Sequence, residues 1–402
     1  MSRLLGYSLI SGLLFASAWP VNGITPLIFI SLIPLLFVED IISSDNLGKK
    51  NLRLFFYSYV AFLTWNIATT WWIVYTTLPG AIFANVANSS FYSIIFLLYS
   101  RVKRKIDFKA GILFLITFWI SFEKFHLNWE FSWPWLNLGN VFSERIDWIQ
   151  WYEYTGVFGG SLWVLCANFL IFNLLRKYSS FKDKRRFYIR IIPRILLISF
   201  PIFVSLLVKP KIDKGEEFKV LITQPKIDPW EAKYGNSKSN LDYFKIFKDL
   251  TNEELSTNEY DFVFTSETYF SEGYGENVDY FGYTKLHDSL NDYLSKFNNT
   301  NLISGIQFYK LYQNQKEKPT KSANPVRDNI WVDYFNSSIN MSANKSFEYN
   351  HKSKLVVGSE YMPFKSFLEP IIGTVMIDLG GTIRSMGTQH ESERKVFKHS
   401  LK

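Results

Sequence analysis

Two carboxylates and one lysine in the second half of the chain are residue types that could do acid–base chemistry together. Glu267 follows the apolar, β-prone segment Phe262–Phe264 in the stretch DFVFTSETYF. Lys352 precedes the apolar run Leu355–Val357, and Glu360 follows it. If the fold brings them together, a carboxylate could accept a proton and the ammonium could stabilise a developing negative charge. Their spacing in the sequence does not by itself establish that they meet.

The segments around these residues predict an α/β domain. Short apolar runs alternate with amphipathic stretches, a pattern typical of strands and helices that follow one another along the chain. Ligands gather at the carboxyl ends of strands in such sheets, and Glu267 is at one of these ends. A solvated carboxylate on a loop is the alternative. The predicted strands are Phe218–Asp228, Asp261–Phe270, Asn301–Tyr309 and Asp328–Ser338, and the predicted helices are Asn240–Ser256 and Thr284–Phe297.

The first half of the chain predicts a membrane domain. Of the 402 residues, 48% are hydrophobic and 18% aromatic, and the apolar residues gather in residues 1–208. A membrane-spanning helix needs about 20 mostly apolar residues. Residues 209–402 are more polar and form the second predicted domain. The seven candidate spans are Leu4–Trp19, Ile24–Val38, Leu52–Thr76, Ala81–Tyr99, Ala110–Phe125, Val157–Leu175 and Ile191–Val208.

Basic loops predict the orientation of these spans. Arg101–Lys105 and Arg176–Arg190 are rich in lysine and arginine, whereas His126–Gly156 is not. Because loops with excess Lys and Arg stay in the cytoplasm, the residues after Lys209 are expected on the outer, periplasmic side. The N-terminus could instead be a signal peptide ending near Ala16–Ala18. The second apolar run that follows within a few residues favours a retained helix.

Composition also argues against several other classes. The net charge of +8 comes from short basic clusters between apolar segments, which is unlike a nucleic-acid-binding stripe. One cysteine, Cys166, and five scattered histidines predict no metal site and no internal disulfide. A transporter or channel would place a charge series inside its helices, and the predicted spans hold few polar residues, such as Asn66 and Asn168.

The stretch WEFSWPWLNLG, Trp129–Gly139, is a candidate surface for a lipid chain. Tryptophan favours the membrane–water boundary, so an interfacial belt is one interpretation. Pro134 between Trp133 and Trp135 favours a shaped loop rather than a helix. An acyl chain that enters sideways from the bilayer would meet these two indole rings.

Taken in order, these stretches resemble the apolipoprotein N-acyltransferase family, the membrane branch of the nitrilase (carbon–nitrogen hydrolase) superfamily. The resemblance rests on SWPWLNLG, on IQWYEYTGVFGGSLWVLCAN, on VLITQPKID with Gln224, on Glu267, and on HKSKLVVGSEYMP. It implies eight membrane helices and an αββα nitrilase-like domain on the periplasmic side of the bacterial inner membrane. It implies no cofactor, and we expect a monomer.

The resemblance also implies a reaction and roles for residues. The family moves an acyl chain from a phospholipid to the α-amino group of a diacylglyceryl-cysteine apolipoprotein, through a thioester on a cysteine. Glu267 matches the general base, Lys352 the lysine that stabilises the oxyanion, and Glu360 a supporting glutamate. Trp133, Trp135 and Gln224 match substrate-binding positions.

The chain departs from the family pattern in ways that bear on activity. Ser266 stands where the family has proline, and LVVGSEY replaces LVPFGEY. No cysteine follows Cys166, which is predicted to lie inside a membrane helix. We therefore expect a C-terminally shortened member whose nitrilase-like domain is incomplete and which is inactive by itself. The alternative is a non-catalytic membrane receptor that binds lipoprotein or phospholipid.

Overall fold

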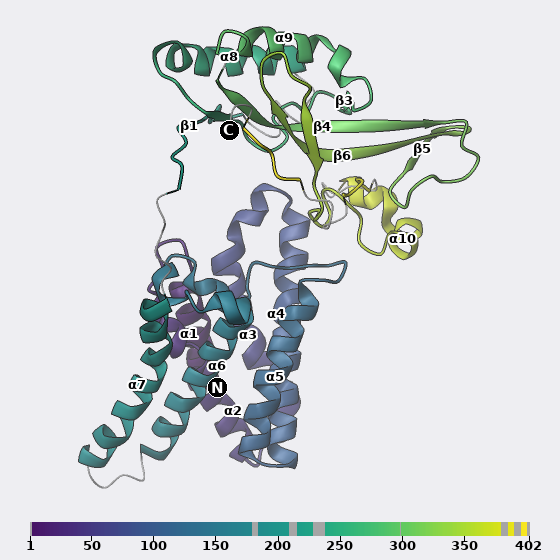
Figure 1. The fold of residues 1–402 in the computed structure, drawn as a ribbon. Helices are drawn as coiled ribbons and strands as arrows, with labels where there is room; N and C mark the ends of the chain where they lie inside the picture. Colours follow the sequence, from purple (N-terminus) through teal and green to yellow (C-terminus); the bar gives the residue numbers. More distant parts are fainter. Residues whose placement is uncertain are drawn as a thin grey trace. The chain divides into compact units, whose positions relative to one another are not determined.

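The computed structural model describes residues 2–178, 184–208, 215–227, 238–297, 299–378, 385–389 and 395–399. The chain divides into two compact units, Met1–Lys211 and Ile212–Lys402, shown as ribbons in Figure 1. The first is the helical unit, and the second is the sheet unit.

The helical unit is built from seven α-helices and four short 3₁₀ segments in its described part. All seven predicted spans overlap these elements. The α-helices are α1 (Ser2–Ala18), α2 (Ile33–Ser44), α3 (Lys50–Thr70), α4 (Leu78–Lys105), α5 (Phe108–His126), α6 (Tyr152–Tyr178) and α7 (Lys184–Val208), and the 3₁₀ segments are η1 (Thr25–Phe29), η2 (Trp71–Tyr75), η3 (Leu138–Phe142) and η4 (Ile146–Trp148).

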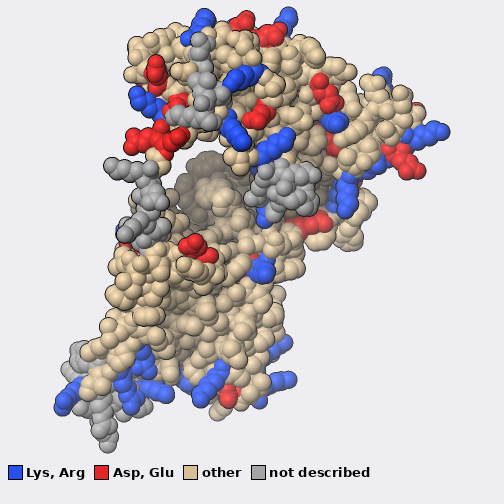
Figure 2. All heavy atoms as spheres, viewed as in Figure 1, with Lys and Arg blue, Asp and Glu red and all other residues tan. Residues whose placement is uncertain are grey.

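Among the described residues, four helical stretches are long and apolar enough to cross a membrane: Thr25–Ser44, Leu78–Lys105, Tyr152–Lys177 and Ile189–Val208. The other three predicted spans form helices α1, α3 and α5. α1 is too short with 17 residues, whereas α3 with 21 and α5 with 19 are long enough but are too polar or too charged over that length. Figure 2 shows Lys and Arg side chains gathered at one end of the helical unit, where α4 ends in Lys103–Lys105.

Aromatic side chains fill the interior of the helical unit. Trp65 stacks on Phe15 with ring centroids 4.7 Å apart, and Tyr92 lies 4.6 Å from Trp119. Both tryptophans are fully buried. α1 and α3 approach closely because Gly12 faces Ala61, where a methyl group would collide with the backbone oxygen of Ala61.

The sheet unit contains a mixed sheet of seven strands in its described part, with the order β1-β2-β4-β6-β5 and with β3 and β7 paired to β4 and β6. β1, β2 and β4 are parallel, whereas the long strands β4 and β6 are antiparallel. The strands are β1 (Val220–Ile222), β2 (Phe262–Phe264), β3 (Glu276–Asn277), β4 (Asn301–Gln313), β5 (Asn324–Arg327), β6 (Ile330–Met341) and β7 (Glu348–His351).

In the described part of the sheet unit, three α-helices and one 3₁₀ segment accompany the sheet: α8 (Asn240–Thr257), η6 (Phe281–Tyr283), α9 (Lys285–Leu294) and α10 (Lys365–Asp378). α8 begins at a capping box in which Ser239 and Asp242 bond each other's backbone N–H groups. α8 and α9 cover one face of the sheet in Figure 1, and the predicted order of strands and helices from β1 to β4 is observed.

The two faces of the β4–β6 pair carry different residues because side chains alternate along a strand. Leu302, Ile306 and Phe308 of β4 join Ile339 and Met341 of β6 in the apolar core beneath α8 and α9. The opposite face carries the alternate residues of these strands, which are mostly polar or glycine: Gly305, Gln307, Asn336, Ser338 and Asn340. The candidate site lies on this polar face.

Candidate acid–base site

Glu267 lies in the short segment 265–269, where the chain leaves the sheet after β2. β2 ends at Phe264, and the backbone rejoins β4 where Phe270 bonds Gly305, with Phe270 N to Gly305 O at 3.1 Å. Thr268 within this segment has a positive φ of 48°. A methyl group on Gly305 would lie 2.7 Å from the Cα of Glu267 and closer still to the neighbouring backbone. Glycine at this position is therefore required for Glu267 to rest on the polar face.

Lys352 follows directly after β7 and is held through its backbone. Its N–H donates to the carbonyl oxygen of Asn336 at 2.8 Å, which continues the pairing of β7 with β6. The backbone of Gln389 donates to the carbonyl oxygen of Lys352 at 3.4 Å. The side chain is 27% exposed.

Glu360 is held by a tight turn that follows Lys352. Its backbone N–H donates to the carbonyl oxygen of Val356 at 3.0 Å, and its carboxylate accepts the N–H of Val356 at 2.7 Å. Gly358 lies inside this turn with φ of 82°, a conformation that favours glycine. The Glu360 side chain is 12% exposed, so the turn leaves its carboxylate fixed and mostly shielded.

The structure brings the three predicted residues together. Lys352 Nζ lies 2.8 Å from Glu267 Oε1 and 3.0 Å from Glu360 Oε2. Glu267 is the most accessible of the three, with its side chain 63% exposed. The Lys352 ammonium therefore bridges the mostly shielded carboxylate of Glu360 and the exposed carboxylate of Glu267.

Asn336 is a fourth member of this cluster that the sequence analysis missed. Its amide nitrogen donates to Glu267 Oε1 at 2.6 Å and to Glu360 Oε1 at 2.7 Å. Asn336 lies in β6 opposite Gln307 of β4, and it is buried. No pattern around DYFNSS marks it, because only the antiparallel pairing of β4 and β6 places this amide between the carboxylates.

The environment keeps Lys352 charged. Burial would lower the pKa of Lys352, but the hydrogen bonds to Glu267 and Glu360 and the charges of both carboxylates outweigh it and raise this pKa above its ordinary value. A cation that stays protonated can stabilise an oxyanion or fix a carboxylate, but it does not serve as a general base. Glu267, with its side chain 63% exposed, is the candidate proton acceptor of the cluster.

His351 packs behind the cluster and faces the apolar core. Its ring stacks on Phe335 with centroids 4.0 Å apart, and its Nδ1 lies 2.7 Å from the Ser337 hydroxyl. Burial, with smaller contributions from the charges of Lys395 and Lys310, lowers the pKa of His351 to about 4. This histidine is therefore neutral at physiological pH and supports the backbone that carries Lys352.

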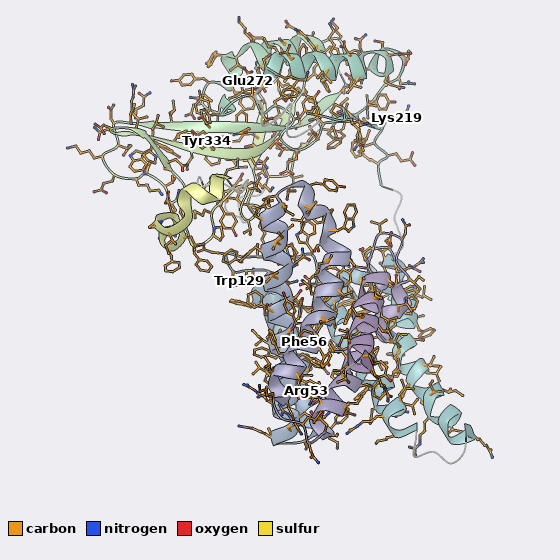
Figure 3. All side chains as sticks on the ribbon, turned by 180° about the vertical axis from the view of Figure 1, so that it is seen from behind. Arg53, Phe56, Trp129, Lys219, Glu272 and Tyr334 are labelled. Carbon is orange, nitrogen blue, oxygen red and sulfur yellow. The ribbon has the colours of Figure 1, made fainter. Side chains whose placement is uncertain are left out.

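The other predicted site residues are Trp133 and Trp135 of the helical unit and Gln224 of the sheet unit. Trp133 is partly buried in the loop after α5, and Trp135 is 50% exposed and packs edge-on against Trp72 at 5.1 Å. Figure 3 labels Trp129 at the start of the same loop. Gln224 is exposed, two residues after β1. The binding roles of these residues stay predictions.

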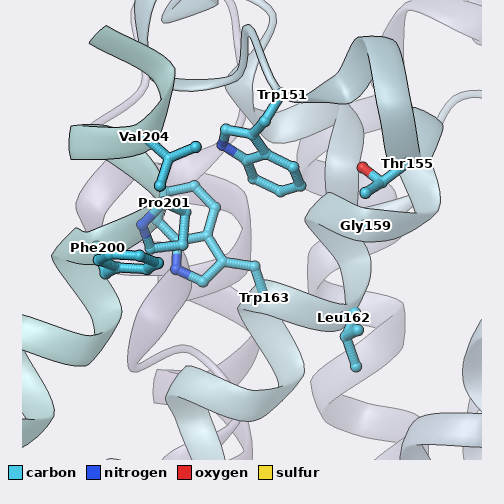
Figure 4. A pocket seen from close by; sticks show the side chains of 8 residues that line it. All are labelled: Trp151, Thr155, Gly159, Leu162, Trp163, Phe200, Pro201 and Val204. Atoms are coloured by element: carbon cyan, nitrogen blue, oxygen red, sulfur yellow. The ribbon is translucent and has the colours of Figure 1, made fainter. Parts of the chain in front are cut away.

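Two further features lie in the helical unit. Cys166, the sole cysteine of the sequence, is partly buried in α6. An apolar hollow of about 350 Å³ lies between α6 and α7. Its lining side chains are shown in Figure 4: Trp151, Thr155, Gly159, Leu162, Trp163, Phe200, Pro201 and Val204.

These features define a class: a protein with membrane-compatible helices and a mixed-sheet unit that carries a glutamate–lysine–glutamate cluster. The family pattern described as the apolipoprotein N-acyltransferase N-terminal domain matches residues 11–170. The chain is thus related to the apolipoprotein N-acyltransferases, and the resemblance predicted from the sequence is confirmed.

Two curated relatives carry the name apolipoprotein N-acyltransferase. The protein of Chlorobaculum tepidum is 27% identical over 241 residues, which cover 58% of this chain and 44% of the relative. The protein of Geobacter metallireducens is 26% identical over 235 residues, which cover 55% of this chain and 43% of the relative. The matched region thus spans less than half the length of either relative.

Proposed function

We propose that this chain takes part in apolipoprotein N-acylation in the bacterial inner membrane. Residues 1–208 would lie in the bilayer, and residues 209–402 would form a nitrilase-like domain on the periplasmic side. A phospholipid is the acyl donor, and the N-terminal diacylglyceryl-cysteine of an apolipoprotein is the acceptor. The family resemblance, the apolar helices and the basic segments Arg101–Lys105, at the end of α4, and Arg176–Arg190 support this proposal.

One observation carries the chemical part of the proposal: the Lys352 ammonium lies within 3.0 Å of the carboxylates of both Glu267 and Glu360. In acyl transfer, Glu267 would take the proton that the acceptor amine loses. Lys352 would stabilise the oxyanion of the tetrahedral intermediate, and Glu360 would hold Lys352 in place. Trp133 and Trp135 would bind the acyl chain and Gln224 the acceptor, without a cofactor and in a monomer.

The second half-reaction balances with these groups. The amine nitrogen attacks a thioester carbonyl, the new C–N bond forms, the C–S bond breaks, and Glu267 receives the amine proton. The thioester needs a thiol beside the cluster, and the sole cysteine of this sequence, Cys166, belongs to α6. We therefore propose that the 402-residue chain binds both lipids but does not complete the transfer alone.

A lipopeptide with a free α-amino group tests the assignment of Glu267. The full chain in detergent micelles should bind a diacylglyceryl-cysteine peptide more tightly than its N-acetylated form, because the exposed carboxylate pairs with the ammonium. Glu267→Gln should abolish this preference, which we expect to be about 3- to 5-fold for a solvent-exposed ion pair. Equal affinities of the wild-type chain for both peptides would contradict the assignment.

An acyl-transfer assay tests whether the chain completes the reaction by itself. The alternative function, a non-catalytic receptor for lipoprotein or phospholipid, also predicts binding without product. The 402-residue chain, given a phospholipid and the diacylated peptide, should bind both and yield no N-acylated product. Product formation that depends on Lys352 would show that the chain is a complete enzyme. Absence of lipid and peptide binding would count against both functions.

A further inference from the structure

Glu123, near the end of α5, is a fully buried carboxylate with three hydrogen-bond donors around it. Its Oε1 accepts the indole N–H of Trp119 at 3.0 Å and the backbone N–H of Leu138 at 2.8 Å. Its Oε2 accepts the hydroxyl of Ser161 at 2.6 Å. The donors come from α5, from the start of η3 and from α6, so one side chain joins three segments of the helical unit.

The chemistry of a carboxylate matches this set of donors. Both carboxylate oxygens accept here, and a neutral amide could take their place only if the Ser161 hydroxyl turned to accept instead of donate. Burying a carboxylate is costly unless hydrogen bonds satisfy its oxygens, and the cost is larger within a bilayer. Three donors supply these bonds here, among the described residues, without a cationic partner.

The contacts around Glu123 fix the far end of the tryptophan-bearing loop, residues 127–142. Ser161, which donates to Glu123, also accepts the backbone N–H of Gly139 at 3.1 Å. The Tyr152 hydroxyl donates to the carbonyl oxygen of Gly139 at 3.0 Å. A methyl group on Gly139 would collide with the backbone of Val157, so the loop lies directly on α6.

The tip of the same loop, Pro134 and Trp135, is accessible to solvent, although its base, residues 136–140, is held in place. Leu136 and Leu138 are buried, whereas Trp135 between Pro134 and Leu136 is 50% exposed. The side chain of Asn140 donates to the carbonyl oxygen of Pro134 at 2.8 Å, which closes the tip upon the base. The position of the Trp135 indole therefore depends on where residues 138–140 are held.

We propose that Glu123 is a positioning residue: its three hydrogen bonds fix the loop 127–142 so that Trp135 meets the acyl chain of the phospholipid donor. This inference rests on the proposed function, because it takes the loop as part of the donor site. It assigns Glu123 to the positioning of a substrate-binding loop rather than to proton transfer.

Binding of a phosphatidylethanolamine with a fluorescent acyl chain, measured with the full chain in detergent micelles, tests the inference. Trp135→Ala should weaken binding, and the nearly isosteric Glu123→Leu should weaken it by about tenfold, the loss that one charge-assisted hydrogen bond represents. Glu123→Gln should recover most of the affinity, because its amide oxygen can accept from Trp119 and Leu138 and its amide nitrogen can donate to Ser161.

Glu39→Leu is the matched control. Glu39 is also fully buried in the helical unit, where it pairs with Lys103 and accepts the hydroxyl of Ser100. This variant should lower the unfolding temperature and leave lipid affinity unchanged when binding is measured well below every unfolding midpoint. Equal weakening by Glu39→Leu and Glu123→Leu would overturn the positioning role.

The remaining outcomes separate the inference from the proposed function. If Trp135→Ala weakens binding and Glu123→Leu does not, the loop binds lipid but Glu123 does not position it. If the wild-type chain shows no saturable binding, or Trp135→Ala leaves it unchanged, the donor site itself is wrong.

Discussion

Large apolar side chains cover much of α7 in the helical unit, whereas in the sheet unit residues of the same kind are packed between α8, α9 and the sheet. Ile195, Leu196 and Leu197 of α7 are each more than half exposed. In the sheet unit, Phe247 of α8 and Leu290 of α9 are fully buried. The difference indicates that the two units are stable in different solvents, because water does not favour an apolar surface of the kind that α7 presents.

The acidic residues Glu123 and Glu267 differ in exposure between the two units. In the helical unit, Glu123 and Asn168 are fully buried and hydrogen-bond to backbone groups of other segments; Asn168 bonds both Ile28 and Leu32. In the sheet unit, the polar cluster opens to solvent through Glu267. Buried polar groups thus join segments of the helical unit, whereas Glu267 of the sheet unit is accessible to solvent.

Placing a lysine on an apolar surface of each unit tests this comparison most strongly. Leu196→Lys, in the middle of α7, should oppose membrane insertion by about 2.5–3.5 kcal/mol. Leu250→Lys on α8, where Leu250 is 46% exposed, should change stability by less than about 0.5 kcal/mol. The membrane-integrated fraction and the unfolding temperature measure the two effects. If Leu196→Lys left membrane integration as unaffected as Leu250→Lys leaves stability, α7 would not face lipid.

Acid should destabilise the sheet unit through His351. Its pKa is about 4 in the folded chain, below its ordinary value of 6.5, so the unfolded chain binds more protons between these values. Stability present above pH 6.5 is therefore lost as pH falls toward 4, by up to about 3 kcal/mol. His351→Asn should flatten this part of the profile of unfolding temperature against pH. Ser337→Ala keeps the imidazole and should retain the slope; a slope unchanged in His351→Asn would assign it to another group.

Adding one methyl group at Gly305 should disturb the site more than a similar change elsewhere in the sheet unit. Gly305→Ala forces the backbone of Ser266–Thr268 outward, and the overpacking should cost about 1–3 kcal/mol. The substitution should also abolish the tighter binding of the lipopeptide with a free α-amino group, because Glu267 would be displaced. Gly282→Ala is the control, because the added methyl group would meet only Phe347 at 3.9 Å. Thermal unfolding and lipopeptide binding report both effects.

Lys352→Met should have a smaller effect on stability, with a distinctive pH dependence. Removing the ammonium leaves Glu360 shielded without its cation and should cost about 1–2 kcal/mol at neutral pH, less than for a fully buried pair. The pKa of Lys352 is raised above its ordinary 10.5, so its contribution is complete below that pH and declines as pH rises through the folded value. The wild-type chain and the variant should converge in unfolding temperature at alkaline pH. Lys245→Met, at the exposed pair with Asp242, should change little.

Several structural features of the protein could be predicted from its sequence. Long apolar runs located the helices of the helical unit, and the alternation of strand and helix predicted β1, α8, β2, α9 and β4. Both signals are local, because burial imposes a period on neighbouring residues. Helix ends were less predictable: α4 extends from Leu78 to Lys105, beyond the predicted Ala81–Tyr99, because the polar ends of a helix carry no apolar signal.

The three charged residues of the cluster were predicted individually as site candidates, but their companions were not. Glu267, Lys352 and Glu360 stand next to apolar runs, and the ends of such runs are where site residues are expected in an α/β domain. Asn336 and Gly305 lie inside strands β6 and β4 and look like ordinary strand residues. Their importance follows from contacts between segments far apart in the sequence, and no local pattern contains that information.

The sequence alone determined that the chain has an apolar half and a polar half, that only one cysteine is present, and which charged residues stand at strand ends. These properties depend on composition and on short-range periodicity, which folding does not change. Tertiary structure decided which face of the sheet is polar, that one ammonium bridges two glutamates, and that Glu123 joins α5, α6 and the tryptophan-bearing loop. Each of these depends on strand register or helix packing, where the free-energy gain comes from residues that meet only after the chain has folded.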